Sequence, residues 1–232
     1  MSANPQAPFF DGSFPHTWQA EILPARPLIL PARHFVYPRH AEEVERGALE
    51  VLVRPVAESG TKLGAPGPGS PRTGLRPGGG DPSHLGTGDS EIPRPQSPQP
   101  QEFLATCALG FRDPLVPTGL WSAPNPDEIC AVSGGYAYII CTTAPERFTM
   151  IEYRPVLQLL PVPAENLLLF VGHHSILAWG ANGQAWQSEK LSDEGLTLAD
   201  MDGPILHGLG WNLMTDKETP FALDLKTGLL KS

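Results

Sequence analysis

Apolar and polar positions alternate most clearly in one segment of the N-terminal half. Every second residue of 49–53 is apolar, whereas Glu50 and Arg54 are charged. Alternation with a period of two indicates a strand with one face in a core and the other toward solvent. The segment 103–111 begins with an apolar run, and we expect it to lie beside the strand over 48–55 in one sheet.

Prolines decide the interpretation of the region before that strand. Residues 21–38 carry two short apolar runs, at 21–23 and 28–30, each closed by the tripeptide Pro-Ala-Arg. Proline removes a backbone donor and breaks helices, so short edge strands or extended packing segments are predicted here. One helical turn is predicted at 41–46, and very little helix elsewhere.

A segment of different composition interrupts the chain. Residues 58–101 contain ten Gly and nine Pro in 44 positions, with few aromatic or β-branched residues. Such a stretch buries too little apolar area to offset the entropy of ordering it, so a disordered insertion is predicted. The domain organisation that follows is a loose tail over 1–20 and one β domain made of 21–57 and 102–232.

Three apolar runs in the C-terminal half repeat at an interval of 38 residues. Each run ends in a glycine, at Gly134, Gly172 and Gly210, and each follows a turn-rich lead. In the middle unit the dipeptide Asn182-Gly183 is a strong signal for a tight hairpin. Each unit therefore reads as strand, Gly turn, strand, second turn and strand. The fold class predicted is all-β, with antiparallel strand units that repeat at about 38 residues.

The segment Val171–Trp186 resembles blades of quinoprotein-like and WD-type β-propellers, which often run through a glycine, a strand near an aromatic, a tight Gly turn and another aromatic. The resemblance covers roughly 126–228 and implies a propeller-like arrangement of units with three or four strands each. Three units are visible, and closed propellers have at least four blades. Strands at 21–55 and 103–121 supply the fourth unit in one interpretation; in the other, the sheets form an open barrel or sandwich.

Charge narrows the classes of partner. The net charge is −9 at pH 7, and a negative surface repels phosphate backbones and anionic lipid, so neither nucleic acid nor membrane is expected as a partner. The first residues lack the basic and apolar regions of a secretory signal, and no apolar stretch approaches the ~20 residues that span a bilayer. A cytoplasmic location is the expectation.

Three cysteines, Cys107, Cys130 and Cys141, lie in apolar surroundings without metal-type spacing. We expect them to pack as small hydrophobic residues, and we expect no cofactor.

Histidines supply the candidate metal ligands. His173 and His174 are adjacent, and His207 follows in the next unit, with Asp193 or Asp200 available to complete a ligand set. Adjacent strand residues point to opposite faces, so both imidazoles reach one metal only if a turn re-aims them. The alternative, which the sequence favours, is that they are solvated or hydrogen-bonded turn residues.

One loop is richer in large apolar side chains than a connection requires. Trp211 and Met214 lie among polar residues in the segment 208–220. The sequence favours a loop folded over the core, and the alternative is an exposed anchor for a partner.

No catalytic motif stands out, so two functions are carried forward. The first is a non-enzymatic binding or scaffold module whose loops at one end of the strand units contact a protein or a small ligand. The second is a small metal-dependent hydrolase that uses His173, His174 and His207. A role of the 58–101 insertion in recruiting a partner is a third hypothesis.

Overall fold

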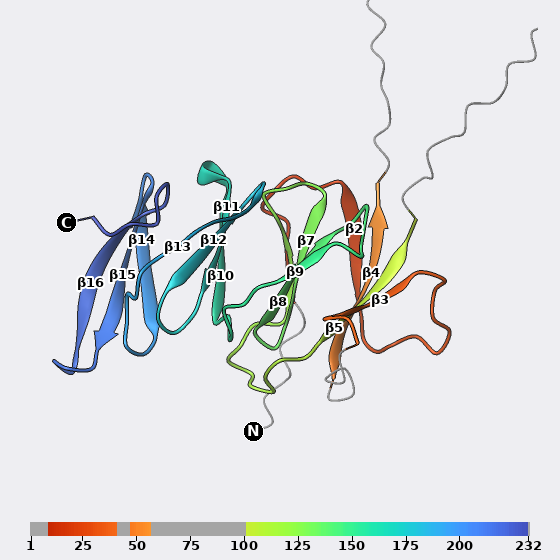
Figure 1. The fold of residues 1–232 in the computed structure, drawn as a ribbon, viewed down its shortest axis with the longest axis horizontal. Coiled ribbons are helices and arrows are strands. Elements are labelled where there is room, and N and C mark those ends of the chain that lie inside the picture. Colours follow the sequence, from red (N-terminus) through yellow and green to blue (C-terminus); the bar gives the residue numbers. More distant parts are fainter. Residues whose placement is uncertain (1–8, 41–46, 57–100, 232) are drawn as a thin grey trace, which may run out of the picture. The chain divides into compact units, whose positions relative to one another are not determined.

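A computed structural model describes residues 9–40, 47–56 and 101–231 of the chain (Figure 1). The predicted helical turn at 41–46 and nearly all of the predicted insertion at 58–101 lie outside these residues. Within the described part, strands dominate, and no helix is long and apolar enough to cross a membrane. The one helical element that the structure gives here is a single 3-10 turn, η2 (Pro163–Glu165). The all-β prediction is confirmed.

In the described part of the chain, sixteen strands form four sheets, which are numbered here from I to IV. Sheet I has the order β2-β4-β5-β3, with β2 (Trp18–Leu23), β3 (His34–Tyr37), β4 (Ala48–Pro55) and β5 (Phe103–Ala108). Sheet II has the order β1-β6-β7-β8-β9, with β1 (Phe9–Asp11), β6 (Gly119–Ser122), β7 (Glu128–Ser133), β8 (Tyr136–Cys141) and β9 (Phe148–Met150).

The remaining two sheets follow the chain order. Sheet III contains β10 (Gln158–Val162), β11 (Leu167–Val171), β12 (Ile176–Gly180) and β13 (Gly183–Gln187). Sheet IV contains β14 (Leu196–Asp202), β15 (Ile205–Asn212) and β16 (Lys217–Asp224). Both sheets are antiparallel throughout, as predicted, whereas sheets I and II each have one parallel edge pair, β3 with β5 and β1 with β6.

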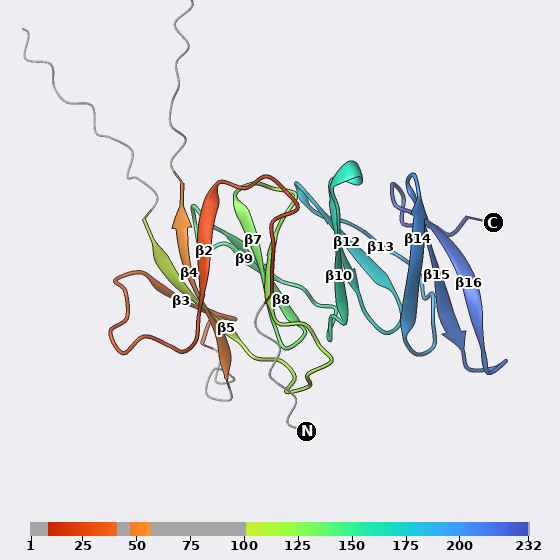
Figure 2. The same ribbon diagram turned by 180° about the vertical axis from the view of Figure 1, so that it is seen from behind.

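Consecutive sheets pack face to face through three apolar cores. The view from behind shows the sheets one after another in this order (Figure 2). The first core joins sheets I and II around Phe103 and Tyr138. The second joins sheets II and III around Trp121 and Phe170, and the third joins sheets III and IV around Leu169 and Leu223. A sheet between two others must be apolar on both faces, and this explains why β7 and β11 are almost continuous apolar runs.

Burial in β15 alternates instead. Leu206, Gly208 and Gly210 are buried, while Ile205 and His207 are half-exposed. Sheet IV therefore has one face in the third core and one face that no described residue covers fully.

The predicted strand over 48–55 is confirmed as β4, which pairs antiparallel with β5. Leu49, Val51 and Val53 face the first core, but Glu50, predicted on a solvent face, is only 5% exposed. The reason is the connection from β2 to β3. These strands run parallel at opposite edges of sheet I, so residues 24–33 cross the outer face, where Arg26 meets Glu50.

The predicted loose tail is wrong for its described part. Phe9–Asp11 forms β1 against β6, and Trp18 is 2% exposed at the start of β2. Phe14 is also buried, and its backbone N–H donates to Ser122 Oγ at 2.9 Å. Tertiary pairing with a distant strand orders this proline-broken segment.

The three repeat glycines do not occupy equivalent corners. Gly134 has φ of +55° and, with Gly135, forms the two-residue turn between β7 and β8. Gly172 directly follows β11, whereas Gly210 lies inside β15. The third unit is out of register with the first two because its strand β15 is longer than the corresponding strands β7 and β11. A hairpin between β12 and β13 is confirmed, but its two turn residues are Ala181 and Asn182, one position earlier than predicted, and Gly183, with φ of +110°, begins β13 opposite Gly180.

Candidate functional site

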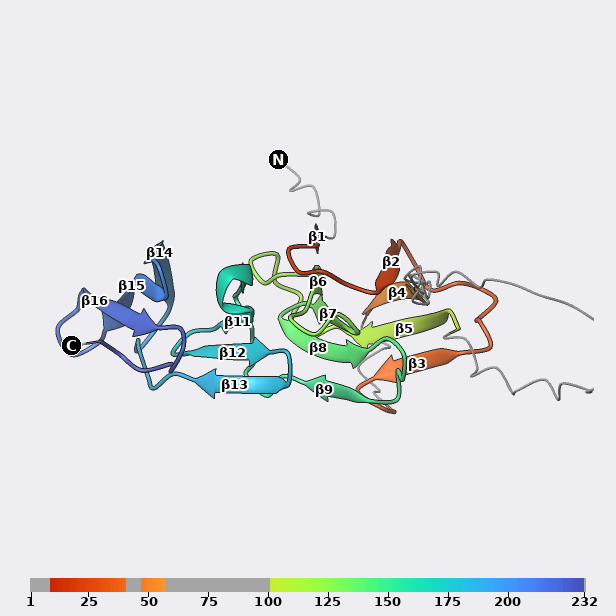
Figure 3. The ribbon, with the colours of Figure 1, turned by 90° about the horizontal axis from the view of Figure 1, so that it is seen from above.

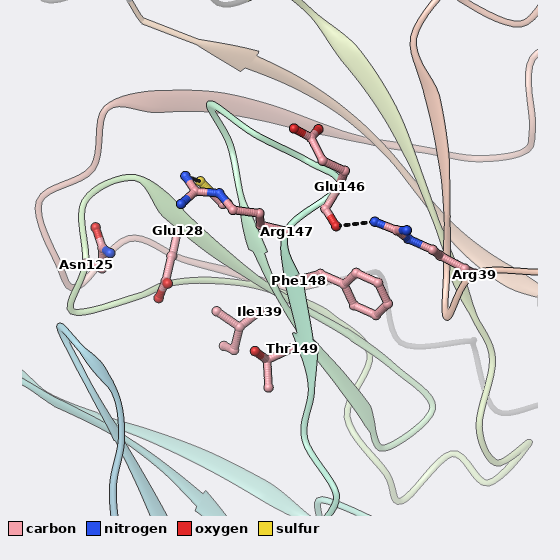
Figure 4. A pocket seen from close by; sticks show the side chains of 9 residues that line it. Arg39, Asn125, Glu128, Ile139, Glu146, Arg147, Phe148 and Thr149 are labelled. Carbon is pink, nitrogen blue, oxygen red and sulfur yellow. Dashed lines mark hydrogen bonds between the residues drawn. The ribbon is translucent and has the colours of Figure 1, made fainter.

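A cavity of about 530 Å³ opens at the end of sheet II, where loops from three connections meet. Arg39 follows β3, Asn125 precedes β7, and Glu146 and Arg147 lie in the hairpin loop between β8 and β9. Figure 4 shows these side chains around Ile139 and Thr149.

Strand alternation places the central pair of the site. Glu128 begins β7 and Cys141 ends β8, and the two are direct cross-strand partners. Cys130 and Ile139, each two residues away on the same strand, belong to the second core. Because side chains two apart share a face, Glu128 and Cys141 also lie on the side of sheet II that faces sheet III.

Glu128 is the half-buried carboxyl group of the cavity. Its Oε2 accepts the indole N–H of Trp179 at 3.0 Å, and this bond links sheet II to sheet III. Burial raises the pKa of Glu128 from its ordinary value, although the Trp179 hydrogen bond and the charge of Arg147 act in the opposite direction. A carboxylate in this position is incompletely solvated.

The loop between β8 and β9 holds two cationic groups at the cavity. Arg147 Nη2 donates to Cys141 Sγ at 3.2 Å, and Arg39 Nη2 donates to the backbone carbonyl of Glu146 at 2.7 Å. Backbone bonds close the loop, from Cys141 N–H to the Arg147 carbonyl at 3.1 Å and from Arg147 N–H to the Ala144 carbonyl at 2.8 Å. The guanidinium of Arg147 is therefore held beside the Glu128–Cys141 pair.

A second cavity of about 470 Å³ adjoins the first through Thr149. Its lining combines the apolar side chains of Leu177 and Trp179 with the polar side chains of Glu152, Gln184 and Gln187. Seen from above, β9 and β13 lie along the same side of sheets II and III (Figure 3). The two adjoining cavities are here called together the β9 groove, with a charged end at the first cavity and a mixed polar and apolar end at the second.

The predicted metal ligands are not gathered into a metal site. His173 and His174 are exposed in the loop between β11 and β12 with ring centroids 6.0 Å apart, and His207 lies on β15. Among residues 9–40, 47–56 and 101–231, no group of three or more His, Cys, Asp and Glu side chains is placed to hold a metal ion. The metal hypothesis thus has no geometric support.

His174 and residues close to it form hydrogen bonds within the chain. His174 Nδ1 lies 3.2 Å from the Ser192 carbonyl, and its backbone N–H donates to Tyr153 Oη at 3.0 Å. A hydrogen bond from Lys190, followed by one from the Leu213 N–H, lowers the pKa of Asp193. These contacts tie the β11–β12 loop to sheet IV, which fits the interpretation of the histidines as hydrogen-bonded turn residues.

Trp211 and Met214 lie at and near the β15–β16 hairpin. Trp211 is half-buried, and its backbone N–H donates to Ser192 Oγ at 2.8 Å. Met214 is 92% exposed at the tip, beside Leu213 at 67%. The core interpretation therefore fits Trp211 in part and does not fit Met214, which is free to contact a partner.

Two of the cysteines are inert. Cys107 and Cys130 are fully buried, and burial raises the pKa of both thiols well above the ordinary value. Cys141 is half-buried, and its sulfur contacts Thr143 Oγ1 at 3.4 Å as well as Arg147.

Sequence reasoning missed the β9 groove. Its charged end combines residues from four segments, and none of these belongs to a recognisable motif. Glu128 carried the one available signal, a charged residue at the start of a strand that is otherwise apolar on both faces.

These features define an all-β protein of face-to-face sheets with a mixed-charge groove beside one edge strand. Comparison of the chain with protein-family models, with characterised proteins and with solved structures gave no match.

Proposed function

We propose that the protein is a non-enzymatic binding module and that the β9 groove is its ligand site. One observation carries the proposal: Glu128 and Arg147 line the same cavity without an ion pair of 4 Å or less between them in the described structure. Opposite charges that border one cavity without direct contact with each other are available to a ligand.

The side chains of the groove support binding rather than catalysis. Among its described lining residues, neither Cys141 nor Thr149 has a histidine or carboxylate within hydrogen-bond distance to act as a base. Covalent catalysis requires such an activated nucleophile. The three predicted metal ligands lie outside the groove lining, so the hydrolase alternative gains no support.

The arrangement of the sheets supports the same proposal. We take the four sheets as blades of an open, propeller-like stack, which fits their consecutive packing in chain order. Loops at the ends of such units commonly carry the binding residues, because a rigid scaffold positions them. The charged end of the groove is built from loops of this kind. The volume suits a small ligand, with a protein segment as the other candidate.

A bulky substitution in the groove tests the proposal. Thr149 is exposed and lines both cavities, so Thr149→Phe fills the junction between them. Thr197→Phe, at an exposed position on β14, is the matched control. Thermal-shift screening of wild type against a library of small polar metabolites should yield compounds that raise the melting temperature of wild type and Thr197→Phe but not of Thr149→Phe. The assignment of the groove as the ligand site is overturned if no compound stabilises wild type, or if a compound stabilises Thr149→Phe as much as wild type.

A further inference from the structure

We infer that the ligand of the β9 groove is a small zwitterion of the α-amino acid class, whose ammonium group contacts Glu128 and whose carboxylate contacts Arg147. This inference rests on the proposed function and names the chemistry of the ligand.

Glu128 indicates the ammonium group. Its Oε2 accepts one hydrogen bond, from Trp179, and no described residue donates to Oε1. A partly desolvated carboxylate is stabilised by a cation that replaces the lost water. Arg147 does not come close enough to form an ion pair with it in the described structure, so this position facing the cavity is open to a cation from the ligand.

Arg147 indicates the carboxylate. Its guanidinium has five N–H donors, and the hydrogen bond to Cys141 Sγ uses one of them. That bond and the closed β8–β9 loop hold the side chain in place before a ligand arrives. The other donors of Arg147 have no hydrogen-bond partner among the described residues, and a planar guanidinium of this kind matches a carboxylate in bidentate geometry.

The spacing of the two groups suits a short ligand. Directly opposed residues on antiparallel strands have Cβ atoms about 5 Å apart, which applies to Glu128 and Cys141. Arg147 Nη2 lies 3.2 Å from Cys141 Sγ, which places the guanidinium near Glu128 as well. In an α-amino acid the amine nitrogen and carboxyl carbon are about 2.5 Å apart. With one hydrogen bond of about 2.9 Å at each end, such a molecule bridges groups that are near but not in contact.

The second cavity of the groove, where polar and apolar side chains are mixed, accommodates the side chain of the ligand. Leu177 and Trp179 supply apolar surface there, and Gln184 and Gln187 supply hydrogen-bonding groups at the edge. The charged end thus recognises the part common to all α-amino acids, and the second cavity selects among their side chains.

Isothermal titration with the full-length protein tests the inference. The probes are the twenty free L-amino acids, each up to 10 mM, followed by the carboxamide and the N-acetyl derivative of any that bind. We expect at least one free amino acid to bind, and removal of either charge from it to weaken binding at least tenfold.

Two variants assign the ends of the ligand. Glu128→Gln keeps an acceptor for Trp179 and should reduce affinity for the free amino acid at least tenfold, with a smaller effect on the N-acetyl form. Arg147→Gln should do the same with the carboxamide as the less affected form. Lys226→Gln, an exposed charge change in sheet IV's terminal turn, should leave affinity unchanged.

The results that overturn the inference are distinct from those that overturn the binding module. Failure of all twenty amino acids, or equal binding of the charge-blocked derivatives, rejects the zwitterion. If a compound without an amine or carboxylate still binds wild type and is excluded by Thr149→Phe, the groove remains the ligand site and only its chemistry is reassigned. The derivative comparison uses wild type alone, so it holds even if Glu128→Gln does not fold.

Discussion

Trp179 of β12 donates its indole N–H to the carboxylate of Glu128 at the start of β7, with a donor–acceptor distance of 3.0 Å. The bond joins sheets II and III at the rim of their shared core, where Trp179 is 6% exposed. It also fixes the orientation of the carboxyl group that we assign to ligand recognition. The same two residues therefore serve packing and the proposed site.

The stability of the protein should depend on the ionisation of Glu128. Burial raises the pKa of this group in the folded state, so the folded protein binds the proton more tightly than the unfolded chain. Wild type accordingly loses stability as pH rises from the unfolded value of about 4.3 through the raised folded value. Gln cannot ionise, so the stability of Glu128→Gln relative to wild type should increase over that window and then level off.

Urea unfolding at intervals from pH 3.5 to 7.5 measures this difference. Glu189→Gln, at an exposed position, controls for loss of a surface negative charge. A relative stability of Glu128→Gln that stays constant or falls with pH would contradict the assignment of burial as the dominant influence.

Replacing Trp179 should separate the hydrogen bond from packing. Trp179→Phe leaves a charged acceptor without its donor, and we expect a loss of about 2–3 kcal/mol at pH 7. Trp186→Phe is the matched control, because Trp186 Nε1 donates at 2.8 Å to a neutral acceptor, the Leu225 carbonyl. A double-mutant cycle with Glu128→Gln should give a coupling of about 1 kcal/mol. A coupling near zero would mean that Trp179 acts through packing alone.

Two arginines, Arg26 on the connection that crosses sheet I and Arg54 in β4, should contribute differently to stability. Glu50 is 5% exposed and accepts Arg26 Nε at 2.8 Å, together with Thr106 Oγ1. Arg26→Gln leaves a buried carboxylate without its cation and should cost about 1–3 kcal/mol, reduced from the fully buried case because Arg26 itself is 41% exposed.

Arg54 provides the comparison for that experiment. It pairs with Glu21 and Glu102 at the surface, so Arg54→Gln should cost less than about 1 kcal/mol. Chemical denaturation of both variants ranks the two pairs. Equal losses of stability would show that residues 24–33, which cross sheet I, do not shield Glu50 from water.

Two glycines of sheet III give opposite expectations on substitution by alanine. A Cβ at Gly172 would lie 1.7 Å from Cε1 of Tyr153, whose hydroxyl accepts the N–H groups of His174 and Ser175. Gly172→Ala should therefore displace Tyr153 and cost several kcal/mol, in the range of overpacking combined with lost hydrogen bonds, about 2–4 kcal/mol. At Gly180 the nearest atom is 3.8 Å away, so Gly180→Ala should change stability by less than about 1 kcal/mol. Melting temperatures of the two variants measure this difference, and equal values would contradict the prediction.

The local sequence pattern predicted where strands form better than it predicted which segments pair or pack with one another. The alternation at 49–53 identified β4 and its core face, and Asn182-Gly183 identified a hairpin, because both signals arise within a few residues. The burial of Glu50 and the order in β1 depend on segments far away in the chain, so no local signal carried them.

The candidate site illustrates the same limit. His173, His174 and His207 suggested a cluster because their residue type suits metals, but strand geometry sends them to separate places. Glu128 and Arg147 line one cavity because β7 and β8 pair in one register and the next loop turns back over them. That proximity follows from pairing, and composition does not reveal it.

The parallel pairing of β1 with β6 has a consequence for the order of folding. Phe9 lies opposite Gly119, about one hundred residues later in the chain, and Phe14 donates to Ser122 over a similar separation. During synthesis the N-terminal strand leaves the ribosome long before its neighbour exists. Contacts of such long sequence separation slow folding, so β1 must wait for β6 and joins sheet II late.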